Sequence, residues 1–512
     1  EYKAQEVEYK AQIKILEEQL KLALIRKYGR STEKYVDPNN PQQDLFGDES
    51  IKAAEDLLKE STDEDEGEKD KITVPEHTRE TKSRGKRENL PDCLERVRVE
   101  YKIPDEDLIA PNGETYMKIG EEISEQLDII PADVRVIQRV RFKYALKNQE
   151  ELGVKIADNP LLPIPKSIAS AGLLAHMAEA KFRHHLPLYR QEKIWTDLGV
   201  HIPRNSMQRW MNTIGHKVQP LIDCLFEEIK SHNHIHADET PVTVLKDDNN
   251  KTKDSHKGYM WVYANKNGVV YDYQSSRAGI HPLNNLVDFK GFVQCDAFSG
   301  YNGLPKAYDI ELVGCWAHAR RKFTEVQKLA GKKNSSPIAD YAVKMIGKLY
   351  KIEKKIKESQ VPPPHIGKYR CENSIPILNK LKVFLTGKYL KVPPKSTIGK
   401  AIYYTLNNWD NLFRYTADGV LNIDNNFAER QIKPFVIGRK NWLFHGSSGS
   451  ARASANIYSL IESAKLYNLK IFDYLKYVFE NIPKADTPRK IEQLLPVYAQ
   501  EYLPQIKIKN RK

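Results

Sequence analysis

The fold is decided by the stretch His234-Ile235-His236-Ala237-Asp238 and by two later stretches that each carry an acid. The second is Gly291-Phe292-Val293-Gln294-Cys295-Asp296, and the third is Asp424-Asn425-Asn426-Phe427-Ala428-Glu429-Arg430. The first two are predicted to be short strands that end on an aspartate, because turn-forming or β-rich residues follow them. The third opens a polar run with a capping residue at its start and no internal Gly or Pro, so it is predicted to be a helix.

More strands and a helix are predicted between the first two acids. They occupy residues 240–245, 259–263, 269–273 and 282–289. Because side chains alternate between the faces of a strand, Asp238 shares a face with His234 and His236. Glu239 lies on the opposite face, which favours Asp238 as the functional acid. For any one acid taken alone, a turn cap is the alternative.

Two carboxylates at strand ends and one on a helix resemble the arrangement of a ribonuclease H-like fold, which is an α/β fold. Carboxylate oxygens suit Mg²⁺ or Mn²⁺. A pair of such ions activates an attacking oxygen and stabilises the leaving one in phosphodiester displacement. The chemistry predicted from the acids is therefore the cutting and joining of DNA.

The sequence around the acids is similar to the insertion sequence 66 family of bacterial DDE transposases, and the similar runs follow the same order from Tyr28 to Leu495. The matching runs are His185-Leu186-Pro187-Leu188-Tyr189-Arg190-Gln191, His236-Ala237-Asp238-Glu239-Thr240-Pro241-Val242, Cys315-Trp316-Ala317-His318-Ala319-Arg320-Arg321-Lys322-Phe323 and Gly438-Arg439-Lys440-Asn441-Trp442-Leu443-Phe444. The resemblance implies that Asp238, Asp296 and Glu429 are the catalytic acids. It also implies that they hold two Mg²⁺ (or Mn²⁺) ions and act on double-stranded DNA.

Composition agrees with a nucleic-acid partner. The chain has 512 residues and a formal net charge of +12, and Lys and Arg that neutralise phosphates supply affinity for a polyanion. Its five cysteines are far apart and form no CxxC pair, which argues against a disulfide framework and for a reducing cytoplasm. No apolar run approaches the roughly 20 residues that span a bilayer, and no signal peptide is recognised. We expect a cytoplasmic, nucleoid-associated protein without a membrane partner.

The N-terminal part is predicted to be a coil followed by a linker. The motif Glu1-Tyr2-Lys3-Ala4-Gln5 recurs seven residues later, and apolar residues continue at spacings of three and four to Ala23. Residues 1–36 are therefore predicted to be a coiled-coil helix that forms a homodimer. A single amphipathic helix packed on its own chain is the alternative. Residues 37–89, rich in polar and acidic side chains, are predicted to be a flexible linker.

Residues 90–158 are predicted to form a small β-rich module, with alternating runs at 97–101 and 134–141. The family's corresponding region resembles a zinc-binding module with two pairs of cysteines. Because the equivalent places carry no cysteine here, we predict a degenerate zinc-finger-like module without zinc. Its basic residues either contact DNA or form a solvated strand face; they are Arg135, Arg139, Arg141 and Lys143.

Residues 159–230 are predicted to be helical, with a possible helix-turn-helix at 188–198 and 203–215 around Gly199. The second helix carries side chains that reach base edges or phosphates. These are Arg204, Asn205, Gln208 and Arg209. A helix pair that serves only as scaffolding is equally compatible with the pattern.

Residues 231–330 form the first part of the predicted core, and 421–450 carry the third acid. His318 is predicted to lie beside the acids and contact a phosphate, with a packed, hydrogen-bonded histidine as the alternative. Zinc is not predicted at Cys315 and His318, because no second pair of ligands is near in sequence. Further DNA contacts are predicted at Arg320, Arg321, Lys322, Arg430, Lys433, Arg439 and Lys440.

The long interval between Asp296 and Glu429 requires an inserted domain, predicted to be helical over residues 331–420, and a helical segment is predicted over 451–512. The insertion either covers the active site, grips the transposon end or serves as scaffold. Trp442 and Phe444 either stack on a flipped base or belong to the core. The turn at 446–449 lacks the Gly-Lys-Ser/Thr ending of a phosphate loop, so no ATP site is predicted.

The predicted function is a transposase that binds the terminal inverted repeats of its element, hydrolyses the strand ends and joins them to target DNA. Small accessory proteins are possible partners. A catalytically inactive copy that acts as a repressor on the same ends is the main alternative. A carboxylate-dependent sugar hydrolase explains neither the basic surface nor the coil.

Overall fold

A computed structural model describes residues 134–144, 155–156, 158–246, 255–330 and 336–505, together with Ile13, Leu16, Glu17 and Leu20. The predicted linker, the strand predicted at 97–101 and most of the predicted coil lie outside the described residues. The chain divides into two compact units, one formed by 62–157 and the other by the remaining residues. In the described part of the chain, no helix is both long enough and apolar enough to cross a membrane.

In the smaller unit, the described strands are β1 (Lys143–Tyr144) and β2 (Lys155–Ile156), which pair antiparallel. The strand predicted over 134–141 is not formed, and that prediction is wrong: residues 134–142 have no regular secondary structure. A strand needs a neighbour that accepts and donates its backbone hydrogen bonds, and none of the described strands pairs with these residues. Val136 is accordingly 89% exposed.

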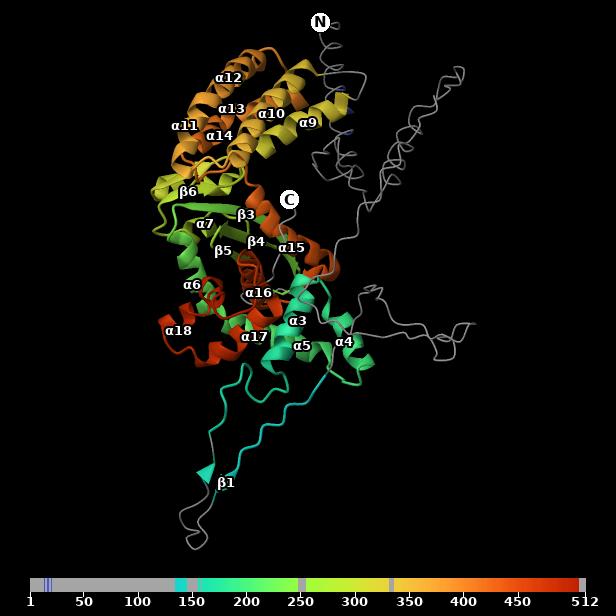
Figure 1. Ribbon diagram of the computed structural model, residues 1–512. Helices are drawn as coiled ribbons and strands as arrows, with labels where there is room; N and C mark the ends of the chain where they lie inside the picture. The colour runs from blue at the N-terminus through green and yellow to red at the C-terminus, as the bar shows by residue number, and fades with distance from the viewer. Residues whose placement is uncertain are drawn as a thin grey trace, which may run out of the picture. The chain divides into compact units, whose positions relative to one another are not determined.

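The larger unit is built on a mixed six-stranded sheet of order β5-β4-β3-β6-β7, with β8 beside β3 (Figure 1). The strands β3, β4 and β5 run antiparallel, whereas β6, β7 and β8 run parallel to β3 or to each other. The strands are β3 (His234–Val244), β4 (His256–Asn265), β5 (Gly268–Gln274), β6 (Gly291–Gln294), β7 (Ile310–Val313) and β8 (Phe444–His445).

Strand β3 is longer than predicted, because the segments expected at 234–238 and 240–245 are one continuous strand. Among the described strands, β6 pairs with β3 only as far as His236, and β8 pairs with it only from Thr243. Pro241 lies between these two stretches, where its missing N–H faces an open side. Asp238 therefore lies within β3, at a gap in the sheet, rather than at a strand end.

Helices cover both faces of the sheet. The helices α15 (Asn426–Trp442) and α16 (Ser448–Leu466) pack on the face of the sheet that carries Asp238. Asp238 of β3 pairs with Val262 of β4, which pairs with Tyr271 of β5, so Tyr271 points to the same face. Tyr271 contacts α15 through its hydroxyl group and α16 through the ring of Tyr458. The seryl hydroxyls of α16 accept hydrogen bonds from the backbone of β5, at 2.9 Å from Val269 and 2.8 Å from Tyr271. The helix thereby protects the exposed edge of the sheet.

The other elements beside this sheet include the helix that carries Leu225 and Ile229, which pack against Gly268 of β5. They are α3 (Ala171–Ala178), η3 (Glu179–Arg183), α4 (Leu188–Asp197), α5 (Arg204–Lys217), α6 (Gln219–Lys230), α7 (Ile280–Asn285), η4 (Ser299–Tyr301), α8 (Leu304–Ala307), α17 (Ile471–Asn481), η6 (Ile482–Lys484), α18 (Pro488–Glu492) and α19 (Pro496–Ala499). The two helices predicted around Gly199 are α4 and α5, and Gly199 has a φ of +77°.

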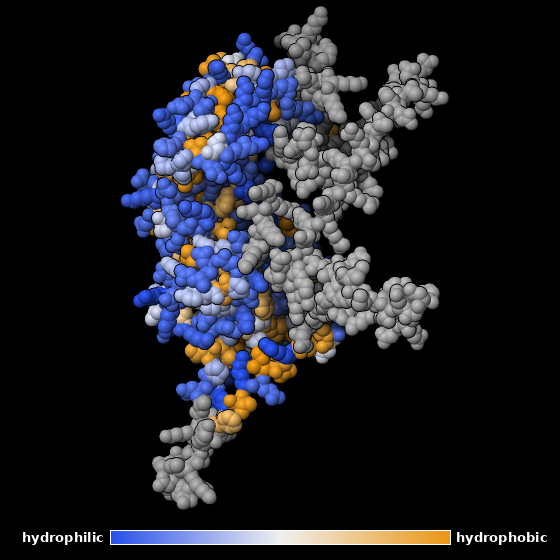
Figure 2. All heavy atoms as spheres, viewed as in Figure 1, coloured by the Kyte–Doolittle hydropathy of each residue, from blue (hydrophilic) through white to orange (hydrophobic). Residues whose placement is uncertain are grey.

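A second apolar core lies in the helices that follow β7, drawn from yellow to orange in Figure 1. These helices are α9 (Trp316–Ala330), α10 (Pro337–Glu358), α11 (Pro363–Asn373), α12 (Ile375–Tyr389), α13 (Thr397–Asn407), α14 (Trp409–Phe413) and η5 (Arg414–Thr416). Buried Arg370 bonds to Glu353 at 2.7 Å and to the carbonyl of Leu421 at 2.9 Å. These bonds hold the segment that leads from η5 back toward the sheet against the helices. The surface over the insertion and the sheet is predominantly hydrophilic (Figure 2).

Candidate active site

Strand pairing brings two of the three predicted acids to the same part of the sheet. The parallel pairing of β3 with β6 ends at His236 opposite Gln294. Asp238 lies two residues further along β3, Asp296 lies two residues beyond the end of β6, and neighbouring strands are about 4.8 Å apart. The register therefore brings both carboxylates to the place where β6 ends and β3 continues.

The electrostatics of Asp238 indicate that the third acid is close as well. Burial raises the pKa of Asp238 well above its usual range, and the negative charges of Glu239, Asp296 and Glu429 raise it further. A hydrogen bond from the backbone N–H of Glu239, at 2.9 Å, acts in the opposite direction. A cation among these carboxylates would relieve the repulsion between them.

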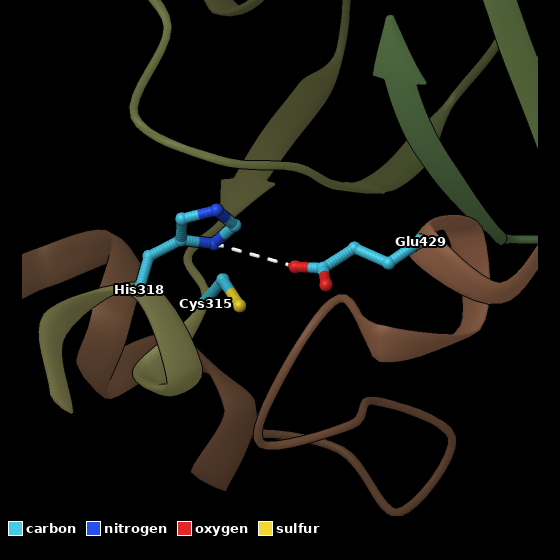
Figure 3. A group of neighbouring side chains, drawn as sticks. All are labelled: Cys315, His318 and Glu429. Carbon is cyan, nitrogen blue, oxygen red and sulfur yellow. Dashed lines mark ion pairs between the residues drawn. The ribbon is translucent and has the colours of Figure 1, made fainter. Parts of the chain in front are cut away.

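Glu429 lies in the first turn of α15, where the positive end of the helix dipole favours a carboxylate. Its side chain points toward the start of α9 (Figure 3). The Oε1 atom is 3.7 Å from Nδ1 of His318, and Oε2 is 3.9 Å from the guanidinium of Arg321. Within the described residues, neither Oε1 of Glu429 nor Nδ1 of His318 has a hydrogen-bond partner, although both atoms are buried.

A network of buried polar side chains holds the start of α15 against β3. The side-chain amide of Asn425 donates to the carbonyl of Ala237 at 2.8 Å, and its Oδ1 lies 2.8 Å from Nδ1 of His236. The other ring nitrogen of His236 is 3.1 Å from the amide of Asn422. Burial lowers the pKa of His236 to about 3, so the ring is neutral and its Nδ1 carries the proton that Asn425 accepts.

Glu239 has a different environment from Asp238. Its carboxylate forms an ion pair with Arg277 and accepts a hydrogen bond from the hydroxyl of Tyr301 at 2.7 Å. The side chain of Glu239 is 1% exposed. The guanidinium of Arg277 lies 3.7 Å from the ring centre of Phe298. Glu239 thus fixes Arg277, which agrees with the opposite faces predicted for Asp238 and Glu239.

A cavity of about 340 Å³ opens beside Asp296. Its wall combines cations, aromatic rings and two acids: Arg277, Asp296, Ala297, Phe298, His318, Arg321, Lys322, Glu325 and Tyr404. The ammonium of Lys322 lies 4.6 Å from the ring centre of Tyr404. The cations of this wall can bind a phosphate group, and the acid beside them can bind a metal ion that also contacts the phosphate.

The predicted DNA contacts form separate groups. Arg321 and Lys322 line the cavity with His318, whereas half-buried Arg320 does not. On α15, Arg430, Lys433 and Lys440 are exposed, and half-buried Arg439 donates to Thr240 at 3.2 Å. A second hollow of about 520 Å³ lies between Arg439, Lys440 and the end of β3. On α5, the four predicted residues are all exposed: Arg204, Asn205, Gln208 and Arg209.

The two aromatic residues proposed for base stacking differ from each other. Trp442 is half-buried and packs edge-on against Phe182 with ring centres 6.3 Å apart, so it belongs to the core. Phe444 is 46% exposed on β8. No sequence pattern pointed to Arg277, Tyr404 or Asn425 as site residues. The helix was predicted to begin at Asp424, whereas α15 begins at Asn426, so Asn425 is the residue before the observed helix.

A mixed sheet under a helical majority, with acids beside a cationic cavity, fits the DDE class of transposases. The chain matches the model of the Transposase IS66 family over residues 166–453, more than half of its length, and it belongs to that family. Two further matches cover the ends: Transposase C of IS166 homeodomain at residues 15–99 and the IS66 C-terminal element at 459–497. The chain is therefore a transposase.

Curated relatives from Sinorhizobium fredii align over most of the chain. The uncharacterized protein y4qI is 33% identical over 394 residues, which cover 74% of this chain and 71% of the relative. The uncharacterized protein y4jD is 32% identical over 395 residues, which cover 74% of this chain and 75% of the relative. No solved structure matches the chain.

The prediction that the chain requires no zinc is wrong. The zinc-finger binding domain of transposase IS66 matches residues 112–145. These residues include neither cysteine nor histidine, and the prediction considered thiolates alone. Zinc also binds carboxylate oxygens, and the matched segment contains acids at Glu114, Glu121, Glu122, Glu125, Asp128 and Asp133.

Proposed function

We propose that the sheet and α15 form a ribonuclease H-like core and that Asp238, Asp296 and Glu429 are its DDE acids. The strand order supports this: an antiparallel meander, β3 to β5, is followed by β6 and β7 added in parallel on the other side of β3. The observation that carries the proposal is the pairing of β3 with β6, which ends two residues before Asp238 on one strand and two residues before Asp296 on the other segment.

The three acids fit divalent ions. The negative charges of Asp296 and Glu429 raise the pKa of Asp238, and Oε1 of Glu429 is buried without a partner among the described residues. The three carboxylates thus supply hard oxygen ligands for a cation. Asp238, Asp296 and Glu429 would hold Mg²⁺ or Mn²⁺. The ions would supply charge neutralisation and activation of the attacking oxygen during phosphodiester displacement.

The cations around the cavity bind and orient the DNA backbone. The ion pair with Glu239 already fixes the side chain of Arg277 beside Asp296. Arg277 therefore loses little side-chain entropy when it binds a phosphate. Arg321 and Lys322 provide two more charges on the same wall. The exposed cations of α15 extend this surface along a duplex, and those of α5 contact the transposon end.

The complete activity that we propose is recognition of the terminal inverted repeats, hydrolysis of the strand ends and transfer of those ends to target DNA. Residues 1–36 bring two chains together, 37–89 separate the coil from the rest, and 331–420 form an insertion within the core. The match over residues 15–99 supports a family-specific N-terminal region. The protein acts in the cytoplasm on the nucleoid, with or without small accessory proteins.

Cleavage by Asp296→Asn tests the proposal. The change removes ligand charge and little volume, so we expect cleavage of a labelled repeat with Mg²⁺ to fall at least about 1,000-fold, the loss of roughly 4 kcal/mol of transition-state stabilisation. Binding of the same end, measured by gel shift, remains. The matched control is Asp309→Asn, an exposed Asp immediately before β7 at the opposite end of the parallel strands.

Normal cleavage by Asp296→Asn would show that the wrong acid was chosen. If the parent protein binds the ends but cleaves them with neither Mg²⁺ nor Mn²⁺, the repressor function replaces the transposase activity for this copy.

A further inference from the structure

The side chains of Cys315, His318 and Glu429 point toward one another (Figure 3), and each carries an atom that can bind a metal ion. The sulfur of Cys315, a ring nitrogen of His318 and a carboxylate oxygen of Glu429 all lie within 4.8 Å of one another. Ligand atoms around one tetrahedral zinc ion are roughly 3.3 to 3.6 Å apart, given bond lengths of about 2.0 to 2.3 Å. A small movement of the side chains would therefore allow all three atoms to bind one ion.

Two unpartnered atoms point to a missing ligand at this place. Nδ1 of His318 and Oε1 of Glu429 are buried, lack a hydrogen-bond partner among the described residues and lie 3.7 Å apart. That separation is too long for a direct hydrogen bond. It is close to the distance between two ligand atoms of one ion, so a single ion would satisfy both atoms.

Cys315 determines which ion fits. Its sulfur accepts a hydrogen bond from the backbone N–H of Asn425 at 3.2 Å. Backbone N–H groups directed at a sulfur stabilise a metal-bound thiolate, and binding would release the thiol proton to solvent. Thiolate and imidazole select Zn²⁺ and similar ions, whereas Mg²⁺ prefers oxygen alone.

We propose that Cys315, His318 and Glu429 form a zinc site that shares Glu429 with the proposed magnesium sites, and that zinc there switches strand cleavage off. Both kinds of ion require Glu429, so zinc competes with magnesium for that carboxylate. With three protein ligands, the site leaves a fourth coordination position for water. The switch rests on the proposed function, whereas the zinc site itself does not.

Cobalt(II) tests the site directly, because Co²⁺ substitutes for Zn²⁺ and absorbs light when it is bound by a thiolate. We titrate Co²⁺ into the full-length protein and measure the thiolate-to-cobalt absorption band. The parent protein should develop the band, Cys315→Ser should lose it, and His318→Gln should weaken cobalt binding at least about 10- to 100-fold. The control is Cys295→Ser, which removes another buried cysteine and keeps the band.

A band of equal strength in Cys315→Ser, or no band in the parent, would overturn the site. Zinc bound by residues 112–145 would not depend on Cys315, so it cannot imitate the expected result.

Inhibition tests the switch. Zn²⁺ is added to magnesium-supported end cleavage, and each variant is compared with its own zinc-free rate. We expect Cys315→Ser to require at least about 10-fold more Zn²⁺ for half inhibition than the parent. If the cobalt band depends on Cys315 but parent and variant are equally sensitive to zinc, the switch is wrong and the site stands. If the parent cleaves nothing, the proposed function fails, and the cobalt result still decides the site.

Discussion

At the scale of single residues, Asp238 combines burial with neighbouring negative charge. Desolvation is the largest cause of its raised pKa, and three nearby carboxylates add to it. A carboxyl group whose pKa is raised in the folded state stabilises that state below the pKa of the unfolded chain. The contribution is lost as the pH rises through the folded-state pKa. At neutral pH without metal, the burial of Asp238 among other carboxylates therefore destabilises the fold.

Asp238→Asn should accordingly stabilise the metal-free protein at pH 7, because the amide keeps the hydrogen bond from Glu239 and carries no charge. A tenfold change in the acid dissociation constant corresponds to about 1.4 kcal/mol, so we expect a gain on the order of 1 kcal/mol or more. Thermal unfolding in a chelator measures it. Near pH 3 the gain should disappear, and Mg²⁺ should stabilise the parent protein but not the variant.

The exposed Asp309→Asn supplies the comparison, since it removes the same charge at a solvated position. Equal unfolding temperatures for both variants at pH 7 would show that the burial and neighbouring charges of Asp238 do not destabilise the protein.

At the scale of elements, α15 carries the third acid, and its start is anchored to β3 rather than capped by its own side chain. Asn425 precedes the helix without forming a side-chain cap. Its amide instead reaches the carbonyl of Ala237, one residue before Asp238. The same side chain contacts His236. Two of the three acids are thus held in mutual position by one buried asparagine.

Asn425→Ala should lower both stability and cleavage, because it removes the partner of the Ala237 carbonyl and of Nδ1 of His236. A buried unsatisfied group costs about 1–3 kcal/mol, which urea unfolding measures. Cleavage should fall more than end binding, because Glu429 loses its fixed position relative to Asp238.

The matched variant is Asn426→Ala, one residue later. Among the described residues, the side chain of Asn426 bonds to nearby Asp424 at 2.8 Å and not to β3. If both variants cleave equally well at a temperature where both are folded, Asn425 has a structural role alone.

At the scale of the whole molecule, the larger unit has two apolar cores, one around the sheet and one within the insertion. The helix α9 contributes to the second core and carries His318 and Arg321 to the acids. The proposed dimer depends on other residues. In the N-terminal segment, Ile13, Leu16 and Leu20 are helical and at least 55% exposed, which leaves their apolar side chains available to a partner helix.

A double variant, Leu16→Lys with Leu20→Lys, should lose self-association, because charge in an apolar seam is not solvated unless the helices separate. Sedimentation of the full-length protein measures the change, and the catalytic unit should unfold at an unchanged temperature. Glu17→Lys is the control: Glu17 is also helical and exposed, and its substitution changes the net charge by the same +2. If the double variant and the control dimerise equally, the coil is not the main dimer contact.

The sequence by itself determined the order of strands and helices and the identity of the candidate acids. The alternation of β3 already separated Asp238 from Glu239, because the direction of a side chain in a strand depends only on its position along the strand. The helix of Glu429 and the helix pair around Gly199 were also predicted, since capping and turn residues act locally. Two local predictions were wrong. The run at 134–141 alternates as a strand does, but it has no paired neighbour in the described structure. The segments expected at 234–238 and 240–245 form one strand, so Asp238 does not end it.

Only the tertiary structure decided which distant side chains meet. The pairing of β3 with β6 brought Asp238 near the end of β6, beyond which Asp296 lies, and the return of the chain from the helices after β7 brought Glu429 to His318 and Cys315. These contacts depend on strand pairing and helix packing between segments far apart in sequence, and no local pattern encodes them. The burial that raises the pKa of Asp238 likewise arises only when the layers close over the sheet.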